Sequence, residues 1–192
     1  AKICKKAGMN AILDGRRIGI IASRAYLVRQ IVPGIEIFGS ITLNTPVGGI
    51  NPIAAETALK LGVKEIWLPT QYSQEQIKIK GIPEHFVFKP DYYDNNANPG
   101  ETILDKNGKM KKACKEIISL AKQYDVVLGT GHLSKNEILS VVNFAKDINF
   151  NNVLITHPHL IVPNLDDNSL SELVKMGAWV EFCAANTLPS GY

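Results

Sequence analysis

The sequence has few cysteines, little net charge and no long apolar run. Three cysteines (Cys4, Cys114 and Cys183) are spread over 192 residues. Their odd number and wide spacing disfavour disulfides and zinc-finger-type sites, and indicate a reduced, cytoplasmic setting. A net charge of +3 gives no reason to expect a nucleic-acid partner. No stretch resembles a signal peptide or a membrane span, so no membrane partner is expected.

The two common nucleotide-binding signatures are also missing. Neither G-x-G-x-x-G nor G-x-x-x-x-G-K-[ST] occurs in the sequence, which disfavours the nucleotide-binding forms of an open α/β sheet. Apolar residues make up 45% of the chain, enough for a sizeable core. We therefore expect a single globular domain over 1–192.

Strand-like and helix-like segments alternate along the chain. This alternation predicts parallel strands joined by right-handed helical crossovers, as in an α/β protein. Either a doubly wound open sheet or part of a (β/α)8 barrel fits this pattern, and polar residues at successive strand ends favour the barrel. The segment at about 71–108 is predicted to be a long irregular loop insert. The expected strands are 10–13, 35–43, 64–68, 126–130, 153–156 and 178–183.

The stretch 126–159 places a histidine after each of two neighbouring strands. His132 follows the first strand and His157 the second. Between the strands, Ser134 and Glu137 form an S-x-x-E capping box that predicts a helix over 134–147. A second box at 169–172 predicts a helix over 167–176. Because parallel strands end at one edge of a sheet, we expect the two imidazoles to converge on one point there.

The histidines and the other polar residues at the predicted strand ends each have a functional and a structural interpretation. A strand-end histidine commonly serves only as a hydrogen-bonding group, but two on neighbouring strands favour a shared metal ion. His159 points elsewhere in an extended chain and is predicted to be a second-shell or loop-surface residue. Asn44 and Thr70 either line the pocket or satisfy backbone groups at their strand ends.

Five motifs occur in a fixed order along nearly the whole chain. They are FGSITLN at 38–44, VGGINP at 47–52, WLPT at 67–70, GTGHLS at 129–134 and THP at 156–158. Together they resemble an uncharacterised family of metal-dependent hydrolases related to the amidohydrolases, which are TIM-type barrels. The resemblance implies that the chain supplies strands two to seven, a partial (β/α)8 barrel. It also implies that His132 and His157 are the strand-five and strand-six ligands of a divalent metal, with Zn²⁺ the first choice.

The chain departs from this family at three places. The family's H-x-H on strand one and Asp on strand eight have no counterpart, so the sequence is expected to be a piece of a longer protein, incomplete at both ends. After its first predicted strand, Arg16 and Arg17 stand where the family has Lys and His. The two arginines either bind a carboxylate or phosphate of the substrate, or mark a degenerate site or a sequence error.

Two functions follow from these interpretations. The first is a metal-dependent hydrolase that acts on a C–N or ester bond of a small molecule, with metal-activated water as the nucleophile. The second is a non-catalytic small-molecule-binding or scaffold barrel with a decayed metal site. Open apolar sheet edges also predict pairing with another copy, and hence a homo-oligomer.

Overall fold

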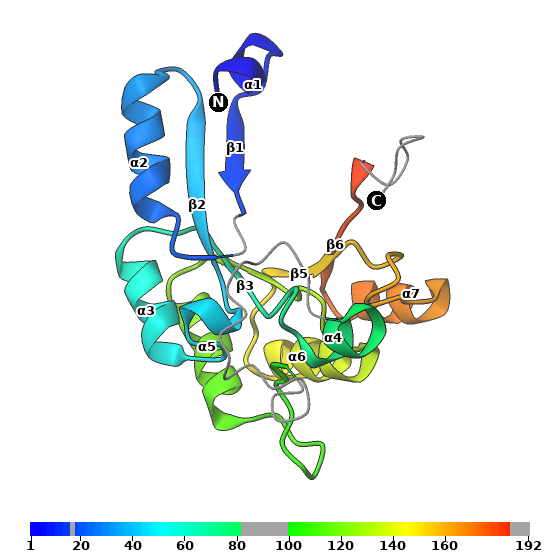
Figure 1. Cartoon of the computed structure of the whole chain (residues 1–192). Coiled ribbons are helices and arrows are strands. Elements are labelled where there is room, and N and C mark those ends of the chain that lie inside the picture. Colours follow the sequence, from blue (N-terminus) through cyan, green and yellow to red (C-terminus); the bar gives the residue numbers. More distant parts are fainter. Residues whose placement is uncertain (16–17, 82–99, 185–192) are drawn as a thin grey trace.

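The protein is an α/β fold built on one curled, all-parallel sheet. The computed structural model describes residues 1–15, 18–81 and 100–184. Six strands lie side by side in sequence order, β1-β2-β3-β4-β5-β6, and form an open half-barrel (Figure 1). The strands are β1 (Ala11–Asp14), β2 (Glu36–Thr42), β3 (Glu65–Trp67), β4 (Val127–Gly129), β5 (Val153–Thr156) and β6 (Trp179–Glu181). The predicted α/β class and parallel pairing are therefore confirmed.

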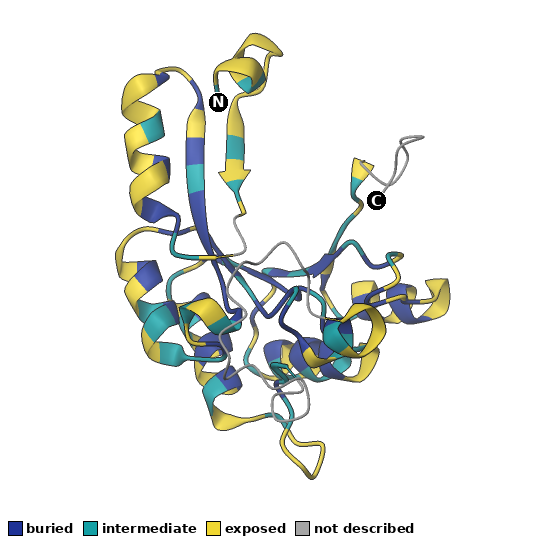
Figure 2. Cartoon of the chain, viewed as in Figure 1, coloured by how far each residue is buried: buried dark blue, intermediate teal, exposed yellow. Residues whose placement is uncertain are grey.

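Helices cover the convex side of the sheet, and the main core lies between the two layers (Figure 2). At this interface the strand residues are apolar and completely buried, as Ile41, Ile66, Leu128 and Ile155 illustrate. The described helices are α1 (Lys2–Lys6), α2 (Ala22–Ile31), α3 (Pro52–Lys60), α4 (Gln74–Lys80), α5 (Lys112–Gln123), α6 (Lys135–Asp147) and α7 (Asp167–Lys175). A membrane-crossing helix is not found in the described part of the chain.

The opposite side of the sheet is concave, and we call it the concave face. Because side chains alternate between the two faces of a strand, every second strand residue points to this side. Its residues are more polar and aromatic than those of the helix-covered face. They include Ser40, Thr42, Glu65, Trp67, Gly129, Thr156, Trp179 and Glu181.

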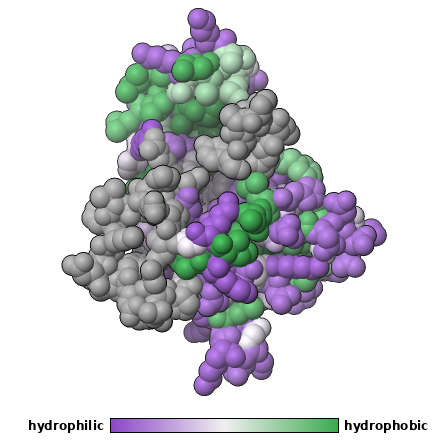
Figure 3. Space-filling view, turned by 45° about the vertical axis from the view of Figure 1, so that its right-hand side comes forward, coloured by the Kyte–Doolittle hydropathy of each residue, from purple (hydrophilic) through white to green (hydrophobic). Residues whose placement is uncertain are grey.

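An N-terminal arm, residues 1–15 and 18–39, stands apart from the main body. Residues 36–39 of β2 pair with β1, whereas residues 40–42 pair with β3, so β2 joins the two parts. The arm has its own small core, formed by Ala25, Val32, Ile35 and Ile37. Figure 3 shows apolar surface gathered toward the top of the molecule, where the arm lies. Exposed large side chains of the arm include Ile3, Met9, Leu13, Tyr26, Leu27 and Ile31.

Local capping explains where the helices near the candidate site begin. The capping box of α6 is confirmed, since the Ser134 backbone N–H donates to Glu137 Oε2 at 2.9 Å. The other carboxylate oxygen of Glu137 accepts from the Ile103 backbone N–H at 3.0 Å, which ties this segment to the helix. The predicted box at 169–172 is wrong. Asp166 caps α7 instead, because its carboxylate accepts from the Ser169 backbone N–H at 2.9 Å.

The segment 71–108 is not irregular throughout, which corrects the prediction of a long loop insert. It contains α4, whose N-cap Ser73 accepts from the Gln76 backbone N–H at 3.1 Å. It also contains a tight turn in which Asp105 Oδ1 accepts from the backbone N–H groups of Asn107 and Lys109. Helix α4 lies over the carboxyl end of the sheet, close to the two histidines.

Candidate functional site

Two imidazoles meet beyond the carboxyl ends of adjacent strands. His132 lies three residues after β4, and His157 directly follows β5. Their Nε2 atoms are 3.2 Å apart, with ring centroids separated by 4.9 Å and ring planes inclined by 63°. The predicted convergence of these two rings is therefore confirmed.

The separation of the two Nε2 atoms fits a shared metal ion. Zinc binds histidine nitrogen at about 2.0–2.1 Å, so two such ligands at the tetrahedral angle lie about 3.3 Å apart. The observed distance of 3.2 Å matches this value. The same separation suits a hydrogen bond between the rings in the metal-free pair. The geometry therefore accommodates both a bound ion and a shared proton.

Gln76 determines which nitrogen of His132 is available. Its side-chain Oε1 lies 2.9 Å from His132 Nδ1. An amide oxygen only accepts, so Nδ1 carries the proton and Nε2 keeps its lone pair, facing His157. Ser73 reinforces this arrangement by donating from Oγ to the His132 carbonyl at 2.7 Å. Helix α4 thus holds both the ring and the backbone of His132.

Close backbone contacts fix the loop that carries His132. Gly131 has a φ of +60°, and a Cβ there would lie 2.4 Å from the Leu68 carbonyl oxygen. The next residue, His132, donates from its backbone N–H to the Pro69 carbonyl at 2.9 Å. Only glycine combines this conformation with this close approach. The β4–α6 loop is therefore locked against the loop that follows β3.

Reciprocal threonine contacts join the two histidine loops. Thr130 Oγ1 accepts from the Thr156 backbone N–H at 3.1 Å, and Thr156 Oγ1 accepts from the Gly131 backbone N–H at 3.2 Å. His157 itself has a φ of +30°, which is unusual for a residue other than glycine. Strained backbone of this kind concentrates at functional sites, where the surrounding structure holds it in place.

Asn44 and Thr70 form a buried pair at the same end of the sheet. Asn44 Nδ2 donates to Thr70 Oγ1 at 2.9 Å, and Asn44 Oδ1 accepts from the Thr70 backbone N–H at 2.9 Å. These contacts join the loops after β2 and β3. The structure thus shows that Asn44 satisfies the backbone N–H of Thr70. That Asn44 and Thr70 also bind substrate stays a prediction.

The other predicted site residues lie away from the pair or outside the described part of the chain. His159 is exposed, pairs with Asp167 at 3.3 Å and packs against Phe182 with ring centroids 5.5 Å apart. This places it on the surface of the loop after β5. Arg16 and Arg17 lie outside the described residues, so their predicted position near the carboxyl end of the sheet stays a prediction.

Within the described residues, no cluster of three or more His, Cys, Asp or Glu side chains could hold a metal. Cys114 contributes no ligand, since it is buried among apolar side chains and burial raises the pKa of its thiol to about 12. The described part of the chain thus offers two imidazoles, fewer than the three protein ligands that catalytic zinc commonly has.

The sequence interpretation missed two polar residues near the pair. Gln76 was missed because α4 itself was not predicted. Glu65 is buried on the concave face, and desolvation raises the pKa of its carboxyl to about 7, an effect that Trp67 partly opposes and Glu181 reinforces. A signal for Glu65 existed, because a carboxylate in the short strand EIW must face something other than the apolar core.

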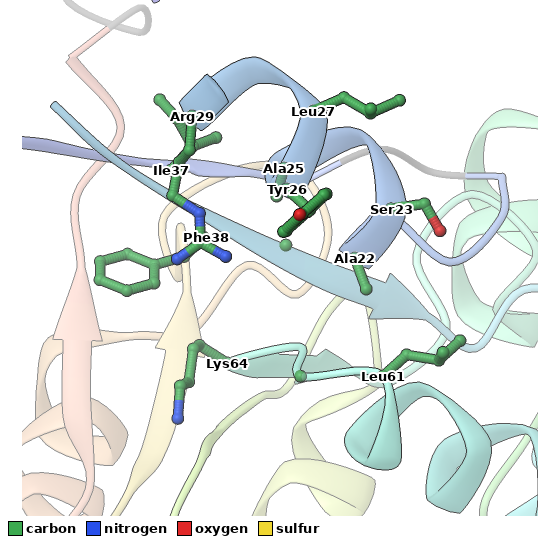
Figure 4. Close-up of a pocket in the computed structure, with 12 residues that line it drawn as sticks. Ala22, Ser23, Ala25, Tyr26, Leu27, Arg29, Ile37, Phe38, Leu61 and Lys64 are labelled. Carbon is green, nitrogen blue, oxygen red and sulfur yellow. The ribbon is translucent and has the colours of Figure 1, made fainter. Parts of the chain in front are cut away.

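One cavity lies elsewhere, on the outer surface between α2 and the start of β3 (Figure 4). It has a volume of about 440 Å³, and none of the residues of the histidine site lines it. Its two cationic side chains are Arg29 and Lys64. Arg29 already pairs with Glu36 at 3.6 Å. This groove is therefore separate from the histidine pair.

Comparison with known protein families identifies the family of this chain. Residues 1–181 match the model of a family of unknown function, DUF6282. The chain belongs to this family. None of the curated proteins compared with it matches its sequence. Membership of DUF6282 defines relatives but assigns no activity, so the function of this DUF6282 protein has to be argued from its site.

The Gln76 contact gives a first testable prediction. Replacing Gln76 with Leu should weaken Zn²⁺ binding by about 10- to 100-fold, because His132 loses the acceptor that orients its ring. Replacing Gln76 with Glu retains an acceptor and should preserve or strengthen binding. Competition against a chromophoric chelator measures both affinities. Equal affinities for the two variants would show that this hydrogen bond does not orient the ligand.

Proposed function

We propose that this DUF6282 protein is a metal-dependent hydrolase of the amidohydrolase type. Its substrate is a small molecule with a C–N or ester bond, and His132 and His157 hold a divalent ion, with Zn²⁺ the first choice. The observation that carries the proposal is the 3.2 Å separation of the two Nε2 atoms at the carboxyl end of a parallel sheet. This is the end where α/β folds concentrate their active sites.

The chemistry follows from the residues on the two loops. A metal held here would lower the pKa of a bound water to about 7, so that hydroxide is available at neutral pH. Gln76 keeps His132 in the tautomer that exposes Nε2. The threonine contacts hold His132 and His157 at a fixed separation. A further ligand would come from outside the described residues.

The remaining expectations belong to the same proposal. The curled sheet is interpreted as strands two to seven of a TIM-type (β/α)8 barrel. Asn44 and Thr70 border the substrate, and Arg16 and Arg17 bind an anionic group of it. The protein acts in the cytoplasm. Its sheet edges, β1 and β6, pair with additional structure, for which a second copy is one candidate.

The direct test is hydrolysis by metal-reconstituted protein. The full chain, treated with chelator and reloaded with one equivalent of Zn²⁺ or Mn²⁺, is incubated with a panel of small amides, lactams and esters. We expect turnover that needs the metal and disappears in His132→Asn. The matched control is His159→Asn, which removes a neighbouring exposed imidazole and should retain activity.

Two results would contradict the proposal. If metal binds tightly but no compound of the panel is hydrolysed while some bind, the non-catalytic binding barrel is the better description. If the chain binds no divalent metal at all, the histidine pair has a structural role, with the hydrogen bond between the rings as its main contribution.

A further inference from the structure

The carboxylate of Glu101 ties the segment 100–104 to the loop after β2. Thr45 Oγ1, on that loop, donates to Glu101 Oε1 at 3.0 Å. The carboxylate also lies against Gly49 of the same loop, where a Cβ would be 2.6 Å from Glu101 Cδ and Oε2. A glycine at position 49 therefore leaves the room that this carboxylate occupies, and the Glu101 side chain is anchored there.

The backbone of Glu101 holds the beginning of α4. Its N–H donates to the Tyr72 carbonyl at 2.7 Å, and its carbonyl accepts from the Gln74 backbone N–H at 2.8 Å. These two hydrogen bonds flank Ser73, the N-cap of α4, whose Oγ donates to the His132 carbonyl. The backbone contacts of Glu101 thus fix the first turn of α4 beside the histidine loop.

Helix α4 transmits this constraint to the imidazole of His132. The Gln76 backbone N–H donates to Ser73 Oγ at 3.1 Å, and the Gln76 side chain accepts from His132 Nδ1. Because Ser73 Oγ also donates to the His132 carbonyl, a displacement of the first turn of α4 would disturb both the ring and the backbone of His132. The orientation of this imidazole therefore depends on where the segment 100–104 holds α4.

The other end of the segment 100–104 contacts the helix that follows His132. Thr102 Oγ1 donates to Glu137 Oε1 at 2.6 Å, and the Ile103 backbone N–H donates to the same oxygen at 3.0 Å. The second carboxylate oxygen of Glu137 caps α6 at Ser134, two residues after His132. The segment thus supports the histidine loop through α4 on one side and α6 on the other.

We propose that Glu101 is a positioning residue for the histidine pair. Its carboxylate anchors the segment 100–104 on the loop after β2, and its backbone holds α4 so that Gln76 stays on Nδ1 of His132. A hydrogen bond to a carboxylate is stronger than one between neutral groups, so the contact with Thr45 can hold the segment in place. The role of His132 as a metal ligand rests on the proposed function, whereas its orientation through Glu101 does not.

The test follows the His132 imidazole of the metal-free full chain, in the presence of chelator and at a pH where the ring is neutral. Long-range proton–nitrogen correlation spectra distinguish a proton on Nδ1 from one on Nε2. We expect the Nδ1–H form in the wild type and a mixture of both tautomers in Glu101→Ala. Glu101→Gln keeps an oxygen that accepts from Thr45, so it should retain the wild-type spectrum.

Two further variants complete the experiment. Thr45→Val removes the donor on the other side of the contact and should change the His132 spectrum in the same direction as Glu101→Ala, so the test stays decisive if Glu101→Ala does not fold. The matched control is Glu116→Ala, which removes an exposed carboxylate that pairs with Lys112 on α5, and it should leave the spectrum unchanged. Thermal unfolding of each variant verifies that the fold is retained.

Zinc affinity gives a second measurement. Glu101→Ala should weaken Zn²⁺ binding by about 3- to 10-fold, less than the loss of Gln76 itself, because Glu101 acts one contact further from the metal. In a Gln76→Leu background the same substitution should cause no further loss, since the contact through which it acts is already missing.

An unchanged His132 spectrum in both Thr45→Val and folded Glu101→Ala would overturn the proposal. Equal losses of zinc affinity in the wild-type and Gln76→Leu backgrounds would do so too, because Glu101 and Gln76 would then act independently. If the wild-type chain binds no zinc, the proposed function fails, but the tautomer of His132 still decides the role of Glu101.

Discussion

A His157→Ala variant is expected to bind Zn²⁺ at least roughly 100-fold more weakly than the wild-type chain. Removing the His157 side chain leaves only the His132 imidazole, where the Nε2 atoms of the two rings now lie 3.2 Å apart. A single neutral imidazole cannot chelate an ion, so the affinity falls to that of an isolated surface histidine. Competition titration against a chromophoric chelator at neutral pH measures the loss, and circular dichroism verifies that the variant is folded.

His159→Ala is the matched control for this experiment. It removes an imidazole two residues along the same loop, where the side chain is exposed and paired with Asp167. We expect its zinc affinity to equal that of the wild type. If His157→Ala and His159→Ala bind zinc equally well, the converging pair is not the metal site.

Replacing Gly131 with Ala should destabilise the protein by about 3 kcal/mol or more. Two effects combine here, since Gly131 has a φ of +60° and a Cβ would lie 2.4 Å from the Leu68 carbonyl oxygen and 2.5 Å from that of Pro69. The left-handed conformation alone costs roughly 1–2 kcal/mol for a residue with a Cβ. The contact with backbone atoms adds to this cost, because these atoms cannot move aside as a flexible side chain does.

Gly62→Ala separates the two effects. Gly62 has a φ of +90°, but a Cβ there would meet no atom within 4 Å. We expect this control to lose only about 1–2 kcal/mol in urea unfolding. Gly131→Ala should also bind zinc more weakly, since the displaced loop carries His132, whereas Gly62→Ala should not. Equal losses of stability in the two variants would show that the close approach at Gly131 is unimportant.

The strands could be predicted from the sequence because alternation and apolar runs determine them locally. The predicted strand 153–156 coincides with β5, and the other predicted strands overlap β1, β2, β3, β4 and β6. Helix α6 was predicted for a local reason too, since its capping box lies within four residues. The start of α7 at Asp167 was predicted correctly, but its cap was assigned to Ser169, because Asp166 and Ser169 both have capping side chains and Asp166 makes the contact.

The candidate site was predictable only in part, because it depends on contacts between distant residues. His132 and His157 could be identified, since each follows a strand of one strand–helix–strand unit. Gln76 could not, because its contact with His132 spans 56 residues and α4 is a short, charged helix without a clear apolar stripe. The approach of Glu65 Oε1 to Gly129 depends on which strands are neighbours, which no local pattern specifies.

The division of the molecule into an arm and a main body has a consequence for how it opens. The arm has a small core of its own, and it is joined to the main body through β2 and through Ala22 of α2, which packs in the main core. Among the described residues, the contacts that fix the two histidine loops come from Pro69, Ser73, Gln76, Thr130 and Thr156, all in the main body. Local opening of the smaller core would therefore break none of these contacts, so we expect the arm to open without displacing the two histidine loops.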